Sequence, residues 1–386
     1  MVEKLNNHRD NLGKQLYMFC FSLYLIINFL GGTTFSRSFG LGMLNFYLRA
    51  SQVIALLVFC KIIFFDRHKF NTNLAFLVGV SYLFIVCKQA HDVSPLVMYL
   101  FVIGAYGIYF KEILQRYIQV ILVMLVFVYG ATLIGLIPNS IMLREGSDIV
   151  RTGLGLATSS DLASHVFYVM LAFALLKNFK IKRQEIVFLS LISILIFALT
   201  NSRLDAILMG ILLLCLYFRS YIFSGVKNLK LSGTSCLIVV YAIANIFLTY
   251  FFDPNVKWYM HLDNLLSRRL LFGKMAFENY QIRFFGQYIY QNGNGDPRGF
   301  TNYYFIDSAY IQALMMFGAI FLLFMLGLLF YVSYRAFQVQ YFGLVVGILL
   351  IVLSMAINHH FWQLSYNVIL LALFSKLPNY AKTRSD

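Results

Sequence analysis

The stretch EIVFLSLISILIFALTNSRLDAILMGILLLCLYFR, residues 185–219, contains two apolar runs separated by a few polar residues. Between Glu185 and Arg219 the only charged side chains are those of Arg203 and Asp205. Each run approaches the roughly 20 apolar residues that a helix needs to cross a bilayer. The stretch therefore predicts two membrane-spanning helices joined by a tight turn, with Arg203 at the mouth of the hairpin.

The same apolar character extends over the whole chain. Of its 386 residues, 60% are hydrophobic and only 12% are charged, too few to give a water-soluble domain a polar surface. The sequence predicts an all-α polytopic membrane protein in which residues 1–386 form a single transmembrane domain, and we expect its first helix to be uncleaved. About twelve spans are expected, near 15–31, 45–65, 72–88, 95–110, 117–137, 161–178, 185–200, 204–219, 234–252, 306–333, 341–357 and 363–376.

The net charge of +15 comes from basic residues in the short loops that follow an even number of predicted crossings. Arg67 follows the second span, for example, and Lys180, Lys182 and Arg183 follow the sixth. Cytoplasmic loops of membrane proteins carry such an excess of Lys and Arg. The distribution therefore predicts that both termini are cytoplasmic, and it accounts for the basic charge without a nucleic-acid partner.

Known cofactor and metal motifs are missing from the sequence. There is no Gly-rich phosphate loop, HExxH or DxD-type metal pair, which weakens the case for an ATP-driven transporter or a metal-dependent soluble-type glycosyltransferase. The five cysteines lack CxxC spacing and lie in or beside predicted spans, where packing is their expected role. They are Cys20, Cys60, Cys87, Cys215 and Cys236. We predict neither a metal nor a cofactor.

Two outward segments, 138–160 and 253–305, are longer than the other connections. The second is a large outer loop in which aromatic residues alternate with basic ones such as Arg268, Arg269 and Arg283. Its part 262–289 has an apolar face at helical spacing, which predicts one or two helices on the membrane surface. Such side chains serve either to anchor a helix at the headgroups or to bind sugar rings and phosphate.

Further polar residues are expected at the outward mouths of spans. Arg151 precedes the sixth span, whose first turn holds Asp161, and Asp307 opens the tenth. For both carboxylates the simpler interpretation is a helix N-cap. For Arg203 the simpler interpretation is an ion pair with Asp205 or snorkelling of its side chain to the lipid headgroups. Residues two apart on a helix do not face each other, which weakens the ion pair.

In this order and on this topology, these elements resemble the bacterial O-antigen and capsule polymerases of the Wzy type and the O-antigen ligases. The resemblance spans about residues 144–320. The matching segments are Arg151 to Gly155, Asn201-Ser202-Arg203, Leu266-Ser267-Arg268-Arg269 with Ala276 and Gly286, and Asp307-Ser308-Ala309-Tyr310-Ile311-Gln312 with Gly318. Arg144 and Gly155 also match the RX10G spacing of some polymerases, whereas Arg283 to Gly293 is one residue short of it.

The resemblance implies a GT-C-like fold and a metal-independent polysaccharide polymerase of the bacterial cytoplasmic membrane, acting on its outer face. Donor and acceptor would be undecaprenyl-pyrophosphate-linked oligosaccharides, and membrane lipids, chain-length regulators and flippases are further candidate partners. In ligases the position of Asp307 is usually His, so Asp favours a polymerase. Ligase-type transfer to another acceptor and a lipid-linked oligosaccharide flippase or transporter are the alternatives.

The predicted site follows from the transfer of a glycan from a pyrophosphate-linked donor to an acceptor hydroxyl. Arg203 and Arg269 would stabilise the departing pyrophosphate, because guanidinium groups can take the place of a metal there. Asp307 is the candidate general base, or it orients the sugar. The runner-up bases lie in NHHFW, 358–362, where neighbouring histidines point in different directions and at most one would act. The remaining predicted substrate-binding residues are Arg151, Arg268, Arg283, Tyr310, His359 and His360.

Overall fold

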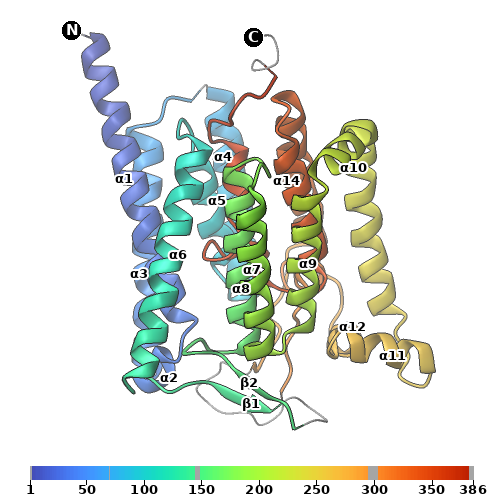
Figure 1. The fold of residues 1–386 in the computed structure, drawn as a ribbon. Helices are drawn as coiled ribbons and strands as arrows, with labels where there is room; N and C mark the ends of the chain where they lie inside the picture. The colour runs from blue at the N-terminus through green and yellow to red at the C-terminus, as the bar shows by residue number, and fades with distance from the viewer. Residues whose placement is uncertain (1, 69, 144–147, 294–302, 382–386) are drawn as a thin grey trace.

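The computed structural model describes residues 2–68, 70–143, 148–293 and 303–381. It is a bundle of long helices with a small two-stranded sheet and two short helices at one end (Figure 1). The helices are α1 (Val2–Gly31), α2 (Phe35–Ser38), α3 (Leu41–Phe64), α4 (Phe70–Ala90), α5 (Ser94–Gly104), α6 (Phe110–Leu133), α7 (Ser159–Leu176), α8 (Arg183–Thr200), α9 (Arg203–Tyr217), α10 (Arg219–Tyr250), α11 (Lys257–Leu265), α12 (Arg269–Asn279), α13 (Ala309–Met315), α14 (Ala319–Gln338) and α15 (Phe342–Met355). Two 3₁₀ turns, η1 (His360–Trp362) and η2 (Ile369–Leu373), follow α15, and the antiparallel strands β1 (Ile141–Leu143) and β2 (Val150–Thr152) lie between α6 and α7.

The length and apolar character of the helices are those of a multi-pass membrane protein. Within the described ranges, eight helices are long and apolar enough to cross a membrane. Three further helices in predicted spans are shorter, at 11 residues for α5, 15 for α9 and 14 for α15. The all-α membrane class is therefore confirmed, whereas the count of about twelve spans stays a prediction because these helices fall below the usual roughly 20 residues.

The last predicted span, 363–376, does not form an α-helix. Its backbone contains only η2, yet it runs through the interior, where Leu370 and Leu371 are fully buried. Asn367 donates to the carbonyl of Phe361 at 3.1 Å, and Arg335 on α14 donates to the carbonyls of Ala372 and Ser375 at 2.6 and 3.0 Å. Non-helical backbone is tolerated at membrane depth where protein groups satisfy it. The prediction of a helix here was wrong because apolar composition does not distinguish a buried irregular segment from a span.

The predicted span 306–333 is interrupted between α13 and α14. Gly318 has a φ of 101°, and a side chain there would lie 2.4 Å from the carbonyl oxygen of Phe284. Gly286 likewise has a positive φ, and a Cβ on it would lie 2.4 Å from the oxygen of Met316. The part of the outer loop around residues 283–286 therefore packs directly onto the helix break. Ala319 completes the junction by donating its N–H to the carbonyl of Arg283 at 2.9 Å.

Both described ends of the chain lie at the same end of the bundle, and the sheet, α11 and α12 lie at the other (Figure 1). Lys14 on α1 forms a 2.8 Å ion pair with Glu112 at the start of α6. Lys376 donates its N–H to the carbonyl of Ile108, which immediately precedes α6, at 2.7 Å. We call the opposite end the loop end. Its outward orientation remains a prediction from the charge distribution.

Helices α7 and α15 occupy the core. Most side chains of both are buried, and α7 packs against α6, α8, α9 and α15. In the large outer loop, α11 and α12 lie across the loop end, in the part predicted to form surface helices (Figure 1). The ends of the core helices and these crossing helices together form the walls of the site described next.

Candidate functional site

A cavity of ≈ 1020 Å³ lies at the loop end, and widely separated parts of the chain line it. They include the end of α1, the β1–β2 hairpin, the start of α7, the α8–α9 turn, the α11–α12 turn and the segment after α15. Seven of the residues predicted from sequence line it together. They are Arg151, Arg203, Arg268, Arg269, Asp307, His359 and His360.

Arg203 begins α9, directly after a tight turn. Asn201 ends α8 in the left-handed conformation, with a φ of 46°. The carboxylate of Asp205 is buried and accepts hydrogen bonds from Ser202, Ser164 and Asn358 at 2.6, 2.8 and 3.0 Å. Asp205 thus fixes the turn through neutral donors.

The guanidinium of Arg203 is exposed and has no hydrogen bond or ion pair with any residue that the structure describes. The alternative pair between Arg203 and Asp205 is therefore not formed. A guanidinium carries five donors in a fixed fork that matches phosphate oxygens. Arg203 can offer all of them to a ligand in the cavity.

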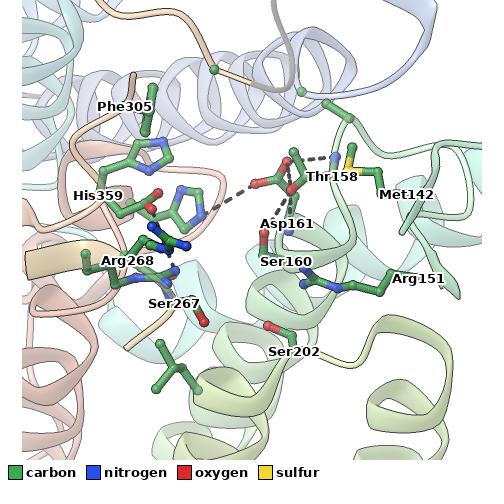
Figure 2. A pocket seen from close by; sticks show the side chains of 18 of the residues that line it. Met142, Arg151, Thr158, Ser160, Asp161, Ser202, Ser267, Arg268, Phe305 and His359 are labelled. Carbon is green, nitrogen blue, oxygen red and sulfur yellow. Dashed lines mark hydrogen bonds and ion pairs between the residues drawn. The ribbon is translucent and has the colours of Figure 1, made fainter. Parts of the chain in front are cut away.

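Arg151 reaches the cavity from β2. The strand pairs with β1 in a register that sets Arg151 opposite Met142. The Nε of Arg151 donates to the carbonyl of Thr200, the last residue of α8, at 2.7 Å. This bond ties the hairpin to the α8–α9 turn and brings Arg151 to the same wall as Ser202 (Figure 2).

Arg268 and Arg269 are held in a strained turn between α11 and α12. Ser267 and Arg268 have φ angles of 56° and 66°, a conformation that L residues seldom adopt. The buried Asp263 stabilises the turn, because its carboxylate accepts from the N–H groups of Leu270 and Leu271 at 2.9 and 3.2 Å. Its carbonyl also accepts from the N–H of Arg268 at 2.9 Å. Burial raises the pKa of Asp263 from its ordinary value.

Arg269 is fixed by the backbone and lies close to Asp307. Its Nε donates to the carbonyl of Ile357 at 2.6 Å, and Nη1 donates to the carbonyl of Leu266 at 2.9 Å. Its Nη2 is 3.9 Å from Oδ2 of Asp307. The N-cap position of α13 belongs to Ser308, so the expectation that Asp307 caps this helix is not met. Both carboxylate oxygens of Asp307 are left to the cavity and to Arg269.

Asp161 combines a capping role with a position in the cavity wall. Thr158 is the N-cap of α7, and Asp161 is its partner three residues later in a capping box. Oδ2 of Asp161 accepts from the N–H and the hydroxyl of Thr158 at 3.1 and 2.8 Å. Oδ1 is 3.7 Å from Nε2 of His360 and faces the cavity (Figure 2). Asp161 is thus not itself the N-cap, and it belongs to the site.

His359 and His360 follow α15, and both rings line the cavity. His360 stacks on Tyr366 with ring centroids 3.7 Å apart and planes at 8°, while His359 packs against Phe305 at 4.8 Å. Burial lowers the pKa of both histidines, that of His360 strongly. Both rings are therefore neutral at pH 7 and able to accept a proton or a hydrogen bond.

Two predicted substrate-binding residues do not reach the cavity. Tyr310 is fully buried, and its hydroxyl donates to the carbonyl of Val352 at 3.0 Å. Arg283 is exposed and is not part of the cavity wall. Arg144, of the RX10G spacing, lies outside the described residues. Sequence reasoning overlooked Gln363 and Tyr366, and only their proximity to the histidine pair could have indicated them.

Among the residues that the structure describes, four arginines and two carboxylates thus share one cavity at the end of an apolar bundle. Figure 2 shows Arg151, Ser202 and Asp161 on one side and Arg268 and His359 on the other. Arginine forks bind phosphate oxygens bidentately, and the carboxylates and aromatic rings suit sugar hydroxyls and sugar faces. The arrangement is suited to a ligand that carries both phosphate and sugar.

The fold and the cavity define a multi-pass helical membrane protein with an arginine-rich site at one end. No protein-family model matches the chain, and no curated protein or solved structure matches it either. The resemblance to the O-antigen polymerases and ligases therefore depends on the residues quoted above.

Proposed function

We propose that this protein is a polysaccharide polymerase with a GT-C-like fold, acting on the outer face of the bacterial cytoplasmic membrane. It joins undecaprenyl-pyrophosphate-linked oligosaccharide repeat units. The observation that carries this proposal is the convergence of Arg151, Arg203, Arg268 and Arg269 on one cavity. A lipid-linked pyrophosphate is an anion held at the membrane surface, where such a cluster is best placed to bind it.

In the proposed reaction, a hydroxyl of the acceptor unit attacks the anomeric carbon of the donor. The new glycosidic bond forms as the bond to pyrophosphate breaks, so negative charge grows on the leaving oxygen. A hydrogen-bond donor that is already positioned where this charge develops lowers the activation barrier by about 2.7–4 kcal/mol. Arg203 is the first candidate for this role because its donors are uncommitted, and Arg269 is the second.

The dimensions of the cavity agree with a ligand of this size. Its ≈ 1020 Å³ lies at the upper end of the roughly 300–1,000 Å³ common for ligand pockets. Tyr303 and Phe272 offer ring surfaces in its wall, with centroids 5.2 Å from one another. Stacking on such rings is a common way to bind the apolar face of a sugar.

The proposal is tested with the purified protein in lipid nanodiscs. Its substrate is the lipid-linked repeat unit that accumulates in cells from which the gene has been deleted. We expect products of two or more units on undecaprenyl pyrophosphate. Transfer only to a different acceptor would indicate a ligase. Absence of any new glycosidic bond, together with movement of the substrate across a proteoliposome membrane, would indicate a flippase.

A further inference from the structure

We propose that His360 is the general base that accepts the proton of the acceptor hydroxyl, with Gln363 and Asp161 as its positioning residues. This assignment rests on the proposed glycosyl transfer. It replaces Asp307 in the role of base and leaves Asp307 to orient the sugar and to balance the charge of Arg269.

The local backbone explains why Gln363 meets His360. The two residues are three apart in the turn that begins with η1, and the N–H of Gln363 donates to the carbonyl of His360 at 3.1 Å. Side chains three apart eclipse each other in a 3₁₀ turn. Nδ1 of His360 accordingly lies 3.0 Å from Oε1 of Gln363.

This contact selects the tautomer of the ring. An amide oxygen only accepts hydrogen bonds, so Nδ1 of His360 carries the hydrogen and Nε2 has a free lone pair. The ring itself is held between Tyr366, at 3.7 Å between centroids, and His359, at 4.3 Å. Nε2 is therefore fixed in the wall of the cavity, as a general base must be.

The other side of Nε2 is occupied by Asp161. Its Oδ1 is 3.7 Å away, and Oδ2 is held by Thr158. When His360 is neutral, neither Nε2 of His360 nor Oδ1 of Asp161 carries a hydrogen to donate to the other. A sugar hydroxyl in the cavity can donate to Nε2, and once the proton has moved, Nε2–H faces the carboxylate. Asp161 thereby stabilises the imidazolium, since an opposite charge nearby favours the protonated form.

The step is balanced. The acceptor oxygen forms its bond to the anomeric carbon and gives its proton to Nε2 of His360. The electron pair of the breaking bond leaves with undecaprenyl pyrophosphate. The imidazolium then returns its proton to water or to the departing pyrophosphate, which restores the neutral ring for the next cycle.

The geometry favours His360 over Asp307 as base. Oδ2 of Asp307 is 3.9 Å from a guanidinium nitrogen of Arg269, and that charge opposes the uptake of a proton. The imidazole of His360 is uncharged and keeps the lone pair of Nε2 free, whereas the carboxylate of Asp307 lies beside Arg269. Nε2 of His360 instead has a carboxylate beside it, that of Asp161 at 3.7 Å.

Several other titratable groups face His360. Asp161 and His165 come from α7, Arg269 from α12, and His359 and Tyr366 from its own segment. Burial, His359, His165 and Arg269 lower the pKa of His360, which keeps the ring neutral and ready at pH 7. A carboxylate introduced at position 363 would act in the opposite direction.

The test compares three variants in the nanodisc assay, using the lipid-linked repeat unit from the deletion strain over a range of pH. We expect His360→Gln to lower kcat about 10²–10⁴-fold with little change in KM, the contribution usual for a general base. The matched control is His261→Gln, because His261 is an exposed histidine of α11 that does not line the cavity. We expect it to retain most of the wild-type kcat.

Gln363→Glu distinguishes a chemical role from a packing role. A carboxylate at Nδ1 raises the pKa of the imidazole, so the acidic limb of the kcat/KM profile should move to higher pH by about one unit. An unmoved limb, or a His360→Gln protein that turns over as fast as wild type, overturns the assignment while the glycosyl-transfer proposal stands. A folded wild-type protein that forms no glycosidic bond refutes both.

Discussion

Replacing Arg203 by Ala should abolish most of the activity while leaving the fold intact. Its guanidinium is exposed and has no partner among the described residues, so its loss should change the free energy of unfolding by less than about 0.5 kcal/mol. In the transition state the same group would face the developing charge on pyrophosphate. Removing one hydrogen-bond donor from an oxyanion hole raises the activation barrier by about 2.7–4 kcal/mol, and by analogy we expect turnover to fall about 10²–10³-fold.

The assay is the initial rate of glycosidic bond formation by purified variants matched for folded protein. Arg203→Lys keeps the charge but loses the bidentate fork, and we expect an intermediate rate. Arg283→Ala is the matched control, because Arg283 is an exposed arginine like Arg203 but lies outside the cavity wall. Wild-type turnover by Arg203→Ala, or an equal loss in Arg283→Ala, would refute the leaving-group assignment.

Three further predictions concern stability. Asp263→Ala removes the acceptor of two N–H groups at the start of α12 and should lower the free energy of unfolding by about 0.5–2 kcal/mol, measured as a lower thermal midpoint in detergent, with the exposed Asp148→Ala as control. Gly318→Ala should reduce the yield of folded protein, because its Cβ would lie 2.4 Å from a backbone oxygen. Gly327→Ala within α14 should not, because a Cβ there would meet no side chain or other segment within 4 Å. Burial lowers the pKa of His359 and His360, so each imidazole binds more proton in the unfolded chain than in the folded one below the unfolded value of about 6.5, and its contribution to stability falls as pH drops through that value. Burial raises the pKa of Asp161 to about 6, which acts in the opposite direction, so the thermal midpoint of His360→Gln is compared with that of wild type. The fall between about pH 7 and 5 should be smaller in His360→Gln, and an equal fall in both proteins would contradict this.

The sequence predicted the arginines of the site better than the groups around them. Arg203 is a charge at the end of an apolar run, which apolar periodicity locates well, and Arg151, Arg268 and Arg269 lie in the segments quoted for the family resemblance. Asp161 was predicted to be a helix N-cap, and it is instead the capping-box partner of the N-cap Thr158. Nothing in the local pattern indicated that its second carboxylate oxygen faces the cavity. A residue can satisfy a local rule and also belong to a site.

Other features depend on contacts that are distant in sequence. Tyr310 follows Asp307 closely, but the phase of α13 turns its hydroxyl to Val352 instead of the cavity. The segment 363–376 is as apolar as a span, yet Arg335 from α14 satisfies its carbonyls and allows an irregular backbone. Such tertiary contacts leave no periodic signal, so the sequence did not indicate that the last segment is irregular or that Tyr310 points away from the cavity.

The central claim is that the arginine-lined cavity couples glycosidic bond formation to the departure of a lipid pyrophosphate. The most direct measurement counts both products in one reaction of the purified protein with its lipid-linked repeat unit. The account predicts one undecaprenyl pyrophosphate released for each new glycosidic bond, with both rates falling together in Arg203→Ala. Consumption of the repeat unit from one leaflet without release of undecaprenyl pyrophosphate would contradict it.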